Sequence, residues 1–173
     1  MKPSVDHSPL GQKTEYVSAY DASLLFPIPR AESRKVLGYE SDVPFFGYDV
    51  WTGYELSWLT LKGKPVVAVA EFLIPASSTN IIESKSFKLY LNSLNQTRFL
   101  SLDEVKSLLI KDLSAAANAD VTVNLYSLNE SSLLVDCTYN ATCIDDLDVE
   151  INEYHPQPEY LKANADVVAT EVL

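Results

Sequence analysis

Two kinds of hydrophobic periodicity divide the middle of the chain into strands and helices. In residues 48–61, apolar and aromatic residues alternate with polar ones, and residues 66–74 form a second, more apolar run; both patterns are typical of β-strands. In the first segment the alternation places Tyr54, Leu56 and Trp58 on one face. A short turn with glycine and proline separates the two segments, so we expect a β-hairpin.

The segment of residues 83–99 has a helical period after its first residue. Phe87, Leu91 and Leu94 recur at i, i+4 and i+7 and form an apolar stripe. We therefore expect an amphipathic helix that buries this stripe. Its opposite face carries Lys85, Lys88 and Asn92.

A second helix is expected after Ser101. Ser101 and Glu104 have the spacing of a capping box, in which each side chain satisfies a free N–H group of the first turn. The helix should end near Asn118. Its apolar stripe consists of Val105, Leu108, Leu109, Leu113 and Ala116.

Strand-like alternation resumes after the second helix. It occurs at residues 121–126 and in a further pair of segments, around 133–139 and around 146–152. The order strand, strand, helix, helix, strand, strand suits a four-stranded antiparallel sheet with both helices on one face. The sequence therefore predicts an α+β fold of the order ββααββ.

Three parts of the chain are distinguished by this pattern. Residues 1–47 contain several prolines and are expected to form an irregular amino-terminal arm. Residues 48–155 form the α+β module. Residues 156–173 are polar and then rich in alanine and valine, and we interpret them as a linker.

Composition narrows the class of protein. The chain has 173 residues, 47% of them hydrophobic, which is enough for one globular domain with a core. No apolar run approaches the ~20 residues that cross a bilayer, and the first residues lack the apolar core of a secretory signal. We therefore expect a cytoplasmic protein that contacts no membrane. A net charge of −11 argues against a nucleic-acid partner.

Cysteine and histidine offer little chemistry. Cys137, Cys143, His7 and His155 do not have the spacing of metal ligands, so no metal is expected. A disulfide between the two cysteines stays open as an alternative, although thiols of cytoplasmic proteins usually remain reduced.

Glu83 is the most informative acid in the sequence. It follows the apolar pair Ile81–Ile82 and borders a basic stretch that contains no other acid up to Leu102. A partly buried carboxylate needs donors, and the N–H and amino edge of a guanine-like base supplies two. The alternative is that Glu83 pairs with Lys85 or Lys88 on a solvated helix and binds no ligand. We expect the lysines and the free backbone N–H groups of the helix start to bind a phosphate group.

The residues from Glu83 to Ser93 match, at every position, the signature Glu-Ser/Leu-Lys-Ser-x-Lys-Leu-Tyr-Leu-x-Ser. This signature resembles that of the NADPH-dependent 7-cyano-7-deazaguanine reductases, the nitrile reductases of queuosine biosynthesis and thus of tRNA modification. The segments that begin at Tyr20, Trp51 and Thr142 resemble the long, two-module form of the same family.

This resemblance implies a fold, a reaction and a set of site residues. The fold is a unit of the tunnelling fold, in which units join edge to edge and ligands bind where they meet. The reaction is reduction of a nitrile to an aminomethyl group with two NADPH. Ile82, Glu83 and Ser84 would bind the deazaguanine, while Ser84 and Lys85 would bind NADPH. Lys88 is assigned no ligand, nor is Arg98, which we expect past the end of the helix.

The resemblance also implies that part of the enzyme is missing. In this family an aspartate, the proton donor, follows the nucleophilic cysteine by seven residues. At that distance Cys137 is followed by Ile144 and Cys143 by Glu150. Both cysteines are therefore interpreted as structural, and no catalytic residue is assigned. The chain is expected to be an amino-terminal module, inactive alone, whose partners are a second catalytic module after residue 173 and a second copy in a homodimer.

Two other functions are compatible with the same fold. A tunnelling-fold cyclohydrolase acting on a pterin is one, but such enzymes usually bring zinc ligands, and the sequence has no His/Cys cluster. The other is a non-catalytic module that binds a purine or a pterin.

Overall fold

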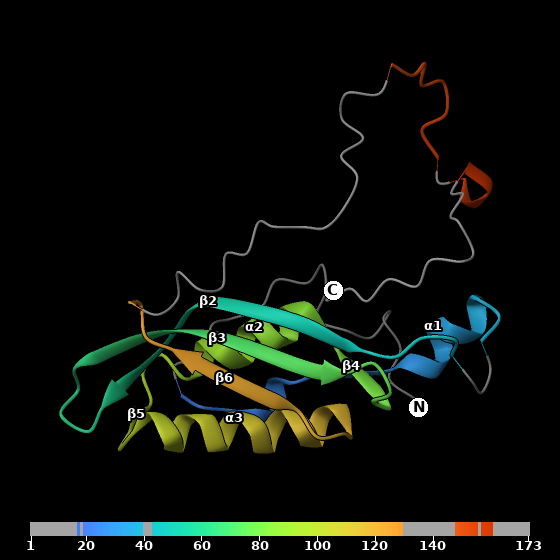
Figure 1. Ribbon diagram of the computed structural model, residues 1–173. Coiled ribbons are helices and arrows are strands. Elements are labelled where there is room, and N and C mark those ends of the chain that lie inside the picture. The colour runs from blue at the N-terminus through green and yellow to red at the C-terminus, as the bar shows by residue number, and fades with distance from the viewer. Residues whose placement is uncertain (1–16, 18, 40–42, 130–147, 156, 161–173) are drawn as a thin grey trace.

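The computed structural model describes residues 17, 19–39, 43–129, 148–155 and 157–160 (Figure 1). The predicted mixture of helices and strands is confirmed as an α+β fold. In chain order the elements are η2 (Ala22–Leu24), β1 (Pro27–Pro29), α1 (Arg30–Val36), β2 (Tyr48–Thr60), β3 (Pro65–Pro75), β4 (Asn80–Ile82), α2 (Ser84–Ser93), β5 (Arg98–Phe99), α3 (Leu102–Ala117), β6 (Thr122–Tyr126) and η4 (Pro158–Tyr160).

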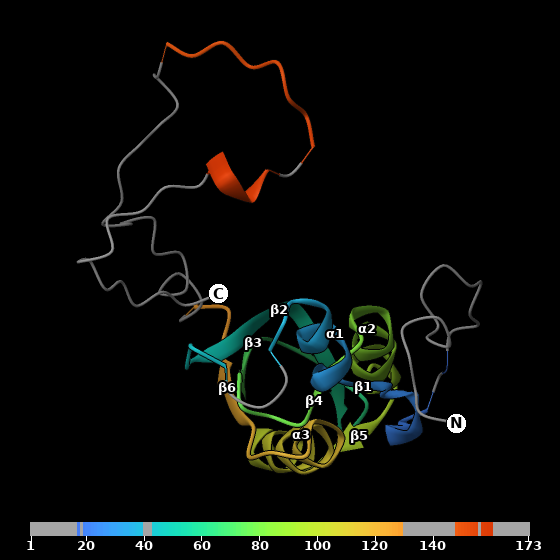
Figure 2. The ribbon, with the colours of Figure 1, turned by 90° about the vertical axis from the view of Figure 1, so that its right-hand side faces the viewer.

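The sheet is built on the predicted hairpin. Strands β2 and β3 pair antiparallel from Tyr48 opposite Pro75 to Leu59 opposite Pro65, which confirms the hairpin. Strand β6 adds antiparallel to β3, and the four strands lie in the order β5-β2-β3-β6. Helices α2 and α3 lie on the same side of the curved sheet (Figure 2), so the apolar residues of both helices and of the sheet form one core.

A β-bulge in β2 corrects the face predicted for Tyr54. Gly53 lies opposite Ala70 and Leu56 opposite Ala68, so β2 contains one extra residue between these pairs. The bulge reverses the alternation of faces. Leu56 and Trp58 are both buried, in agreement with the shared face predicted for them, but the Tyr54 side chain is 67% exposed.

The predicted order of strands is only partly correct. Strand β5 follows α2 directly and pairs parallel with β2, so the sheet is mixed rather than antiparallel. The strand predicted at 133–139 lies outside the described residues. Of the strand predicted at 146–152, the described part, 148–152, is exposed and irregular. Alternation alone did not make a strand there, because a strand also needs a paired edge.

The segment expected to be an irregular arm contains regular structure. Strand β1 pairs antiparallel with β4, with Ile28 opposite Ile81, and α1 follows β1 at once. The Arg30 guanidinium also forms an ion pair with Asp49 at the start of β2. The arm is therefore attached to the rest of the fold, and the division into an arm, a module and a linker stays a prediction.

Both predicted helices are present. Helix α2 ends at Ser93 and β5 begins at Arg98, so Arg98 lies past the end of the helix, as predicted. Helix α3 starts as predicted: the Ser101 hydroxyl accepts a bond from the Glu104 N–H at 3.2 Å. It ends at Ala117, followed by Asn118 in the left-handed conformation (φ 52°) that is common after a helix.

A carboxylate lies inside the core, where the sequence analysis had expected an apolar stripe. Asp112 of α3 is only 8% exposed. Its Oδ2 accepts hydrogen bonds from the hydroxyls of Tyr20 and Tyr90, at 2.7 and 2.8 Å. These bonds join three segments: the arm, α2 and α3.

We predict that Asp112→Ala lowers the free energy of unfolding by about 1–3 kcal/mol, because the fully buried hydroxyl of Tyr90 loses its acceptor. Denaturant unfolding measures this change. Asp120→Ala, which removes an exposed acid just after the same helix, serves as the control and should change stability by less than about 0.5 kcal/mol. Equal effects of the two variants would contradict the structural role of Asp112.

Stability should also fall at alkaline pH. Burial, together with the hydrogen bond to Asp112, raises the pKa of Tyr20 to about 12. An unfolded tyrosine loses its proton near pH 10, so the folded state holds more protons between about pH 10 and 12, and stability decreases as the pH rises through this range. In unfolding curves over this range, Tyr20→Phe should make the decrease shallower, whereas Tyr54→Phe, at an exposed position, should not.

Candidate functional site

Glu83 lies at the entrance of α2 and is buried. Its carboxylate accepts hydrogen bonds from the backbone N–H groups of Lys85, at 2.8 Å, and Ser86, at 2.7 Å, one on each oxygen. Glu83 is thus the N-cap residue of α2, and it is only 6% exposed. It is therefore not the solvated surface charge that the alternative described, whereas binding of a ligand by Glu83 stays a prediction.

The cap changes one expectation about the helix start. The sequence analysis expected free backbone N–H groups here that could hold a phosphate. Two of them, those of Lys85 and Ser86, are occupied by the Glu83 carboxylate. Because each carboxylate oxygen has two lone pairs, these two bonds leave acceptor capacity for another donor.

The other predicted site residues surround Glu83 in different ways. Ile82 ends strand β4 and is buried in the core. Ser84 is exposed, and its hydroxyl lies 3.4 Å from Oε1 of Glu83. Lys85 is half-buried in the first turn of α2. The four residues are contiguous. The turn from β4 to α2 therefore carries an acid, Glu83, a hydroxyl, Ser84, and an ammonium group, Lys85, at successive positions.

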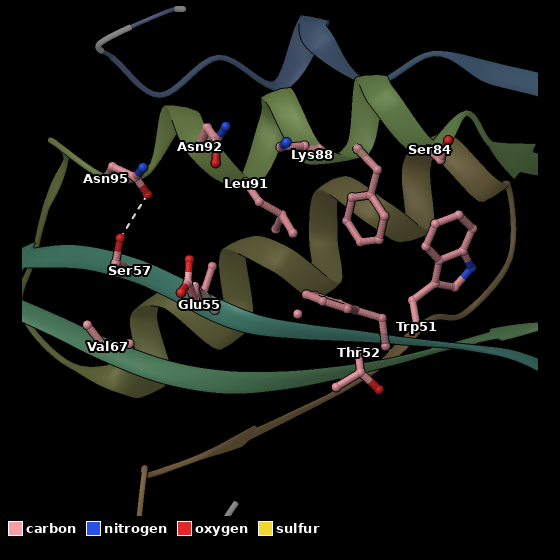
Figure 3. Close-up of a pocket in the computed structure, with 14 residues that line it drawn as sticks. Trp51, Thr52, Glu55, Ser57, Val67, Ser84, Lys88, Leu91, Asn92 and Asn95 are labelled. Carbon is pink, nitrogen blue, oxygen red and sulfur yellow. Dashed lines mark hydrogen bonds between the residues drawn. The ribbon is translucent and has the colours of Figure 1, made fainter. Parts of the chain in front are cut away.

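A groove of about 580 Å³ opens beside this turn, between α2 and β2 (Figure 3). Ser84 and Lys88 line it, whereas Ile82, Glu83 and Lys85 do not. The apolar floor includes Trp51, and Figure 3 shows the Trp51 ring beneath Ser84. Its other side chains are Thr52, Glu55, Leu56, Ser57, Val67, Phe72, Phe87, Leu91, Asn92 and Asn95, with Gly53 at the backbone.

The groove depends on the bulge in β2. The extra residue at the bulge leaves Glu55 exposed at the rim while Leu56 returns to the core. At the far end the Ser57 hydroxyl donates to Oδ1 of Asn95 at 2.9 Å, which ties β2 to the end of α2. Glu55, Asn92 and Asn95 were not predicted as groove residues, because the bulge in β2 cannot be located from alternation and the groove forms between segments distant in sequence.

The remaining cations of the basic stretch differ in their surroundings. Lys88 is exposed at the rim of the groove. Arg98 lies past the end of α2, as predicted, and its guanidinium donates to the backbone oxygen of Leu61 at 2.9 Å. Cys137, Cys143 and His7 lie outside the described residues. No helix within the described part of the chain has the length and apolar character to cross a membrane.

Comparison with known proteins gives the family. Residues 16–125 match the family model described as nitrile reductase, 7-cyano-7-deazaguanine-reductase N-term. Proteins named NADPH-dependent 7-cyano-7-deazaguanine reductase from Burkholderia lata, Burkholderia multivorans and Burkholderia ambifaria are each 51% identical to the chain over 166 residues.

These alignments are unequal in coverage. They include 96% of this chain but 61% of each relative, so the chain spans about three fifths of the length of the curated relatives it matches. The matched family model covers the arm from residue 16 onward, both helices of the core and the sheet up to Leu125. The resemblance read from the segment Glu83–Ser93 is confirmed, and the chain belongs to the family of 7-cyano-7-deazaguanine reductase amino-terminal regions, the nitrile reductases.

Proposed function

We propose that this chain is the amino-terminal part of an NADPH-dependent 7-cyano-7-deazaguanine reductase, which reduces the nitrile of the deazaguanine to an aminomethyl group. The whole protein's reaction requires groups that the described residues do not supply, above all a nucleophile. In this proposal the chain recognises the base and the cofactor, and the chemistry is completed by a second catalytic module that follows it.

The observation that carries the proposal is the buried carboxylate of Glu83. Two backbone N–H groups hold it at 2.7 and 2.8 Å, so its orientation is set before any ligand arrives. Its remaining acceptor capacity suits the N–H and amino edge of a deazaguanine. Ser84 lines the groove, and its hydroxyl lies 3.4 Å from Oε1 of Glu83, so a base bound there would lie close to this carboxylate. In this proposal Ile82, the residue before Glu83, also belongs to the base-binding turn.

Such a site would be selective. A base without two adjacent donors would leave the buried carboxylate partly unpaired, which costs more than the loss of an apolar contact. The chain as a whole, with a net charge of −11, repels an anionic ligand, so the lysines of α2 provide the positive charge that attracts it locally.

The residues at the start of α2 fit a dinucleotide cofactor. Ser84 offers an exposed hydroxyl, and Lys85 a positive charge for a phosphate, while Glu83 already occupies the N–H groups that a phosphate would otherwise use. In this proposal Ser84 and Lys85 hold NADPH, which supplies hydride when bound. The chain's own contribution is to bind and orient the cofactor.

We also propose that the fold is a unit of the tunnelling fold. The hairpin of β2 and β3 with α2 and α3 on one face supports this assignment. Most of β2 is an open sheet edge in the described part of the chain, because β5 pairs only with Leu59 and Thr60. Open edges favour association, which supports a homodimer and a second module beyond the linker at 156–173. A cytoplasmic location belongs to the same proposal.

We predict that Glu83→Gln in the full-length protein weakens binding of 7-cyano-7-deazaguanine by about 1.5–3 kcal/mol, because the hydrogen bonds lose their charge and one acceptor. Glutamine is a sharper test than alanine, since alanine also removes the helix cap. Calorimetric titration with the nitrile base measures the change.

Glu104→Gln is the matched control for this experiment. Glu104 accepts the Leu100 N–H at 2.6 Å before α3, so it is also a capping acid, but it lies outside the groove lining. Its substitution should leave base binding unchanged. Equal affinities for Glu83→Gln and the unsubstituted protein would mean that Glu83 is a helix cap only.

A second prediction concerns the missing part. The protein extended to the length of its relatives should oxidise NADPH in the presence of the nitrile base, and residues 1–173 alone should not. Absorbance of NADPH measures this, with the base omitted as control. If the extended protein binds the base but does not oxidise NADPH, a non-catalytic purine-binding module becomes the better description; turnover by residues 1–173 alone would contradict the proposed division of labour.

A further inference from the structure

A row of hydroxyl groups follows the side of α2 that faces the arm. Ser86 and Ser93 are spaced at i and i+7, so they lie on one side of α2. Thr97 lies in the turn after the helix and continues the row, since its hydroxyl bonds both to Ser93 and to the arm. Ser86 and Ser93 are fully buried. Since a buried hydroxyl must be hydrogen-bonded to be tolerated, the partners of these two side chains are informative. The family signature includes both serines, but the proposed function assigns neither of them a role.

Each hydroxyl makes the same pair of bonds. It accepts a backbone N–H from the arm, from Phe26 at 3.0 Å, Asp21 at 3.2 Å and Tyr20 at 3.2 Å respectively. It also donates to a backbone carbonyl of the helix, at distances from 2.6 to 3.1 Å. The arm is therefore fixed antiparallel to α2 by hydrogen bonds that only hydroxyl side chains can make.

Ser86 differs from the other two because its partners include Glu83. Its hydroxyl donates to the Glu83 carbonyl at 2.7 Å, and its own N–H donates to Oε2 of Glu83 at 2.7 Å. Phe26, whose N–H the Ser86 hydroxyl accepts, in turn accepts the Glu83 N–H at 3.0 Å. The backbone N–H, the carbonyl and the carboxylate of Glu83 are thus all held in one closed ring with Ser86 and Phe26.

We infer that Ser86 is a positioning residue for recognition of the base, acting through Glu83. Its hydroxyl couples the arm to the turn before α2 and fixes the backbone from which the Glu83 carboxylate projects. This inference rests on the proposed function, because it assigns Ser86 to the same base-binding site. Ser86 does not line the groove and is not itself assigned a contact with the ligand.

Ser93 provides a control that separates positioning from stability. Its hydroxyl accepts an arm N–H and donates to a helix carbonyl, as that of Ser86 does, and it is equally buried. It lies two turns further along α2 and makes no bond with Glu83. Alanine at either position removes one arm bond and one carbonyl bond, so a purely structural role predicts similar consequences for both variants.

The test compares Ser86→Ala and Ser93→Ala in the full-length protein by steady-state kinetics with NADPH and 7-cyano-7-deazaguanine, and by thermal unfolding. We expect Ser86→Ala to raise the KM for the base by about tenfold or more, as expected for the loss of an oriented hydrogen bond, with kcat little changed. Ser93→Ala should stay within about twofold in KM while losing a similar amount of stability.

Ser86→Cys is a second variant that keeps the test decisive if Ser86→Ala does not fold. The thiol fills the space of the hydroxyl but is a weak donor and acceptor. It should raise the KM in the same direction. Equal KM values for the Ser86 and Ser93 variants, or a KM unchanged in both Ser86 variants, would overturn the inference. If the unsubstituted protein neither binds nor reduces the base, the proposed function fails, and this inference fails with it.

Discussion

The arrangement of this chain depends on one hydrogen-bonded turn, in which the carboxylate of Glu83 caps α2. The carboxylate satisfies two N–H groups that every helix start leaves unpaired, and the helix start in turn stabilises a charge that is almost excluded from water. Neither group is stable in this environment alone. A buried acid and a buried helix end compensate each other, and the result is a charge with a fixed direction.

The rest of the fold holds this turn from three sides. Strand β4 leads into it and is paired with β1 of the arm, and the core packs Phe87 and Tyr90 of α2 against the sheet and α3. The hydroxyls of Tyr20 and Tyr90 converge on Asp112, which links the arm to α3. Because polar groups in a core have few alternative partners, this network specifies one position of the arm rather than several.

The sequence was most informative where a local rule determines the structure. The hairpin, the capped start of α3 and its end at Asn118 follow from alternation, the capping spacing and a left-handed residue, and all three were predicted. What was missed depends on tertiary contacts. The parallel pairing of β5 and the bulge that exposes Tyr54 are set by partners distant in sequence.

The candidate site shows the same division. Glu83 was identified from its neighbours, an apolar pair before it and a basic stretch after it. Its hydrogen-bond donors were not identified, because the prediction considered a ligand and lysine side chains as donors and not the backbone N–H groups of α2. Asp112 could have been noticed, since it interrupts the apolar stripe of α3 between Leu109 and Leu113. Its tyrosine partners lie 92 and 22 residues away, and nothing local indicates them.

The choice of glutamate at the cap argues for more than a structural role. Helix N-caps are normally serine, threonine, aspartate or asparagine, whose short side chains reach the N–H groups at lower entropic cost. Here a serine, Ser84, follows immediately, and a cap could have been made one residue later. The longer glutamate instead spreads its two oxygens over two N–H groups, and Oε1 also lies 3.4 Å from the Ser84 hydroxyl, so Oε2 has the acceptor position that these bonds leave over. A position that departs from the local preference is where a functional constraint is expected, and a ligand that donates to this carboxylate would explain the departure.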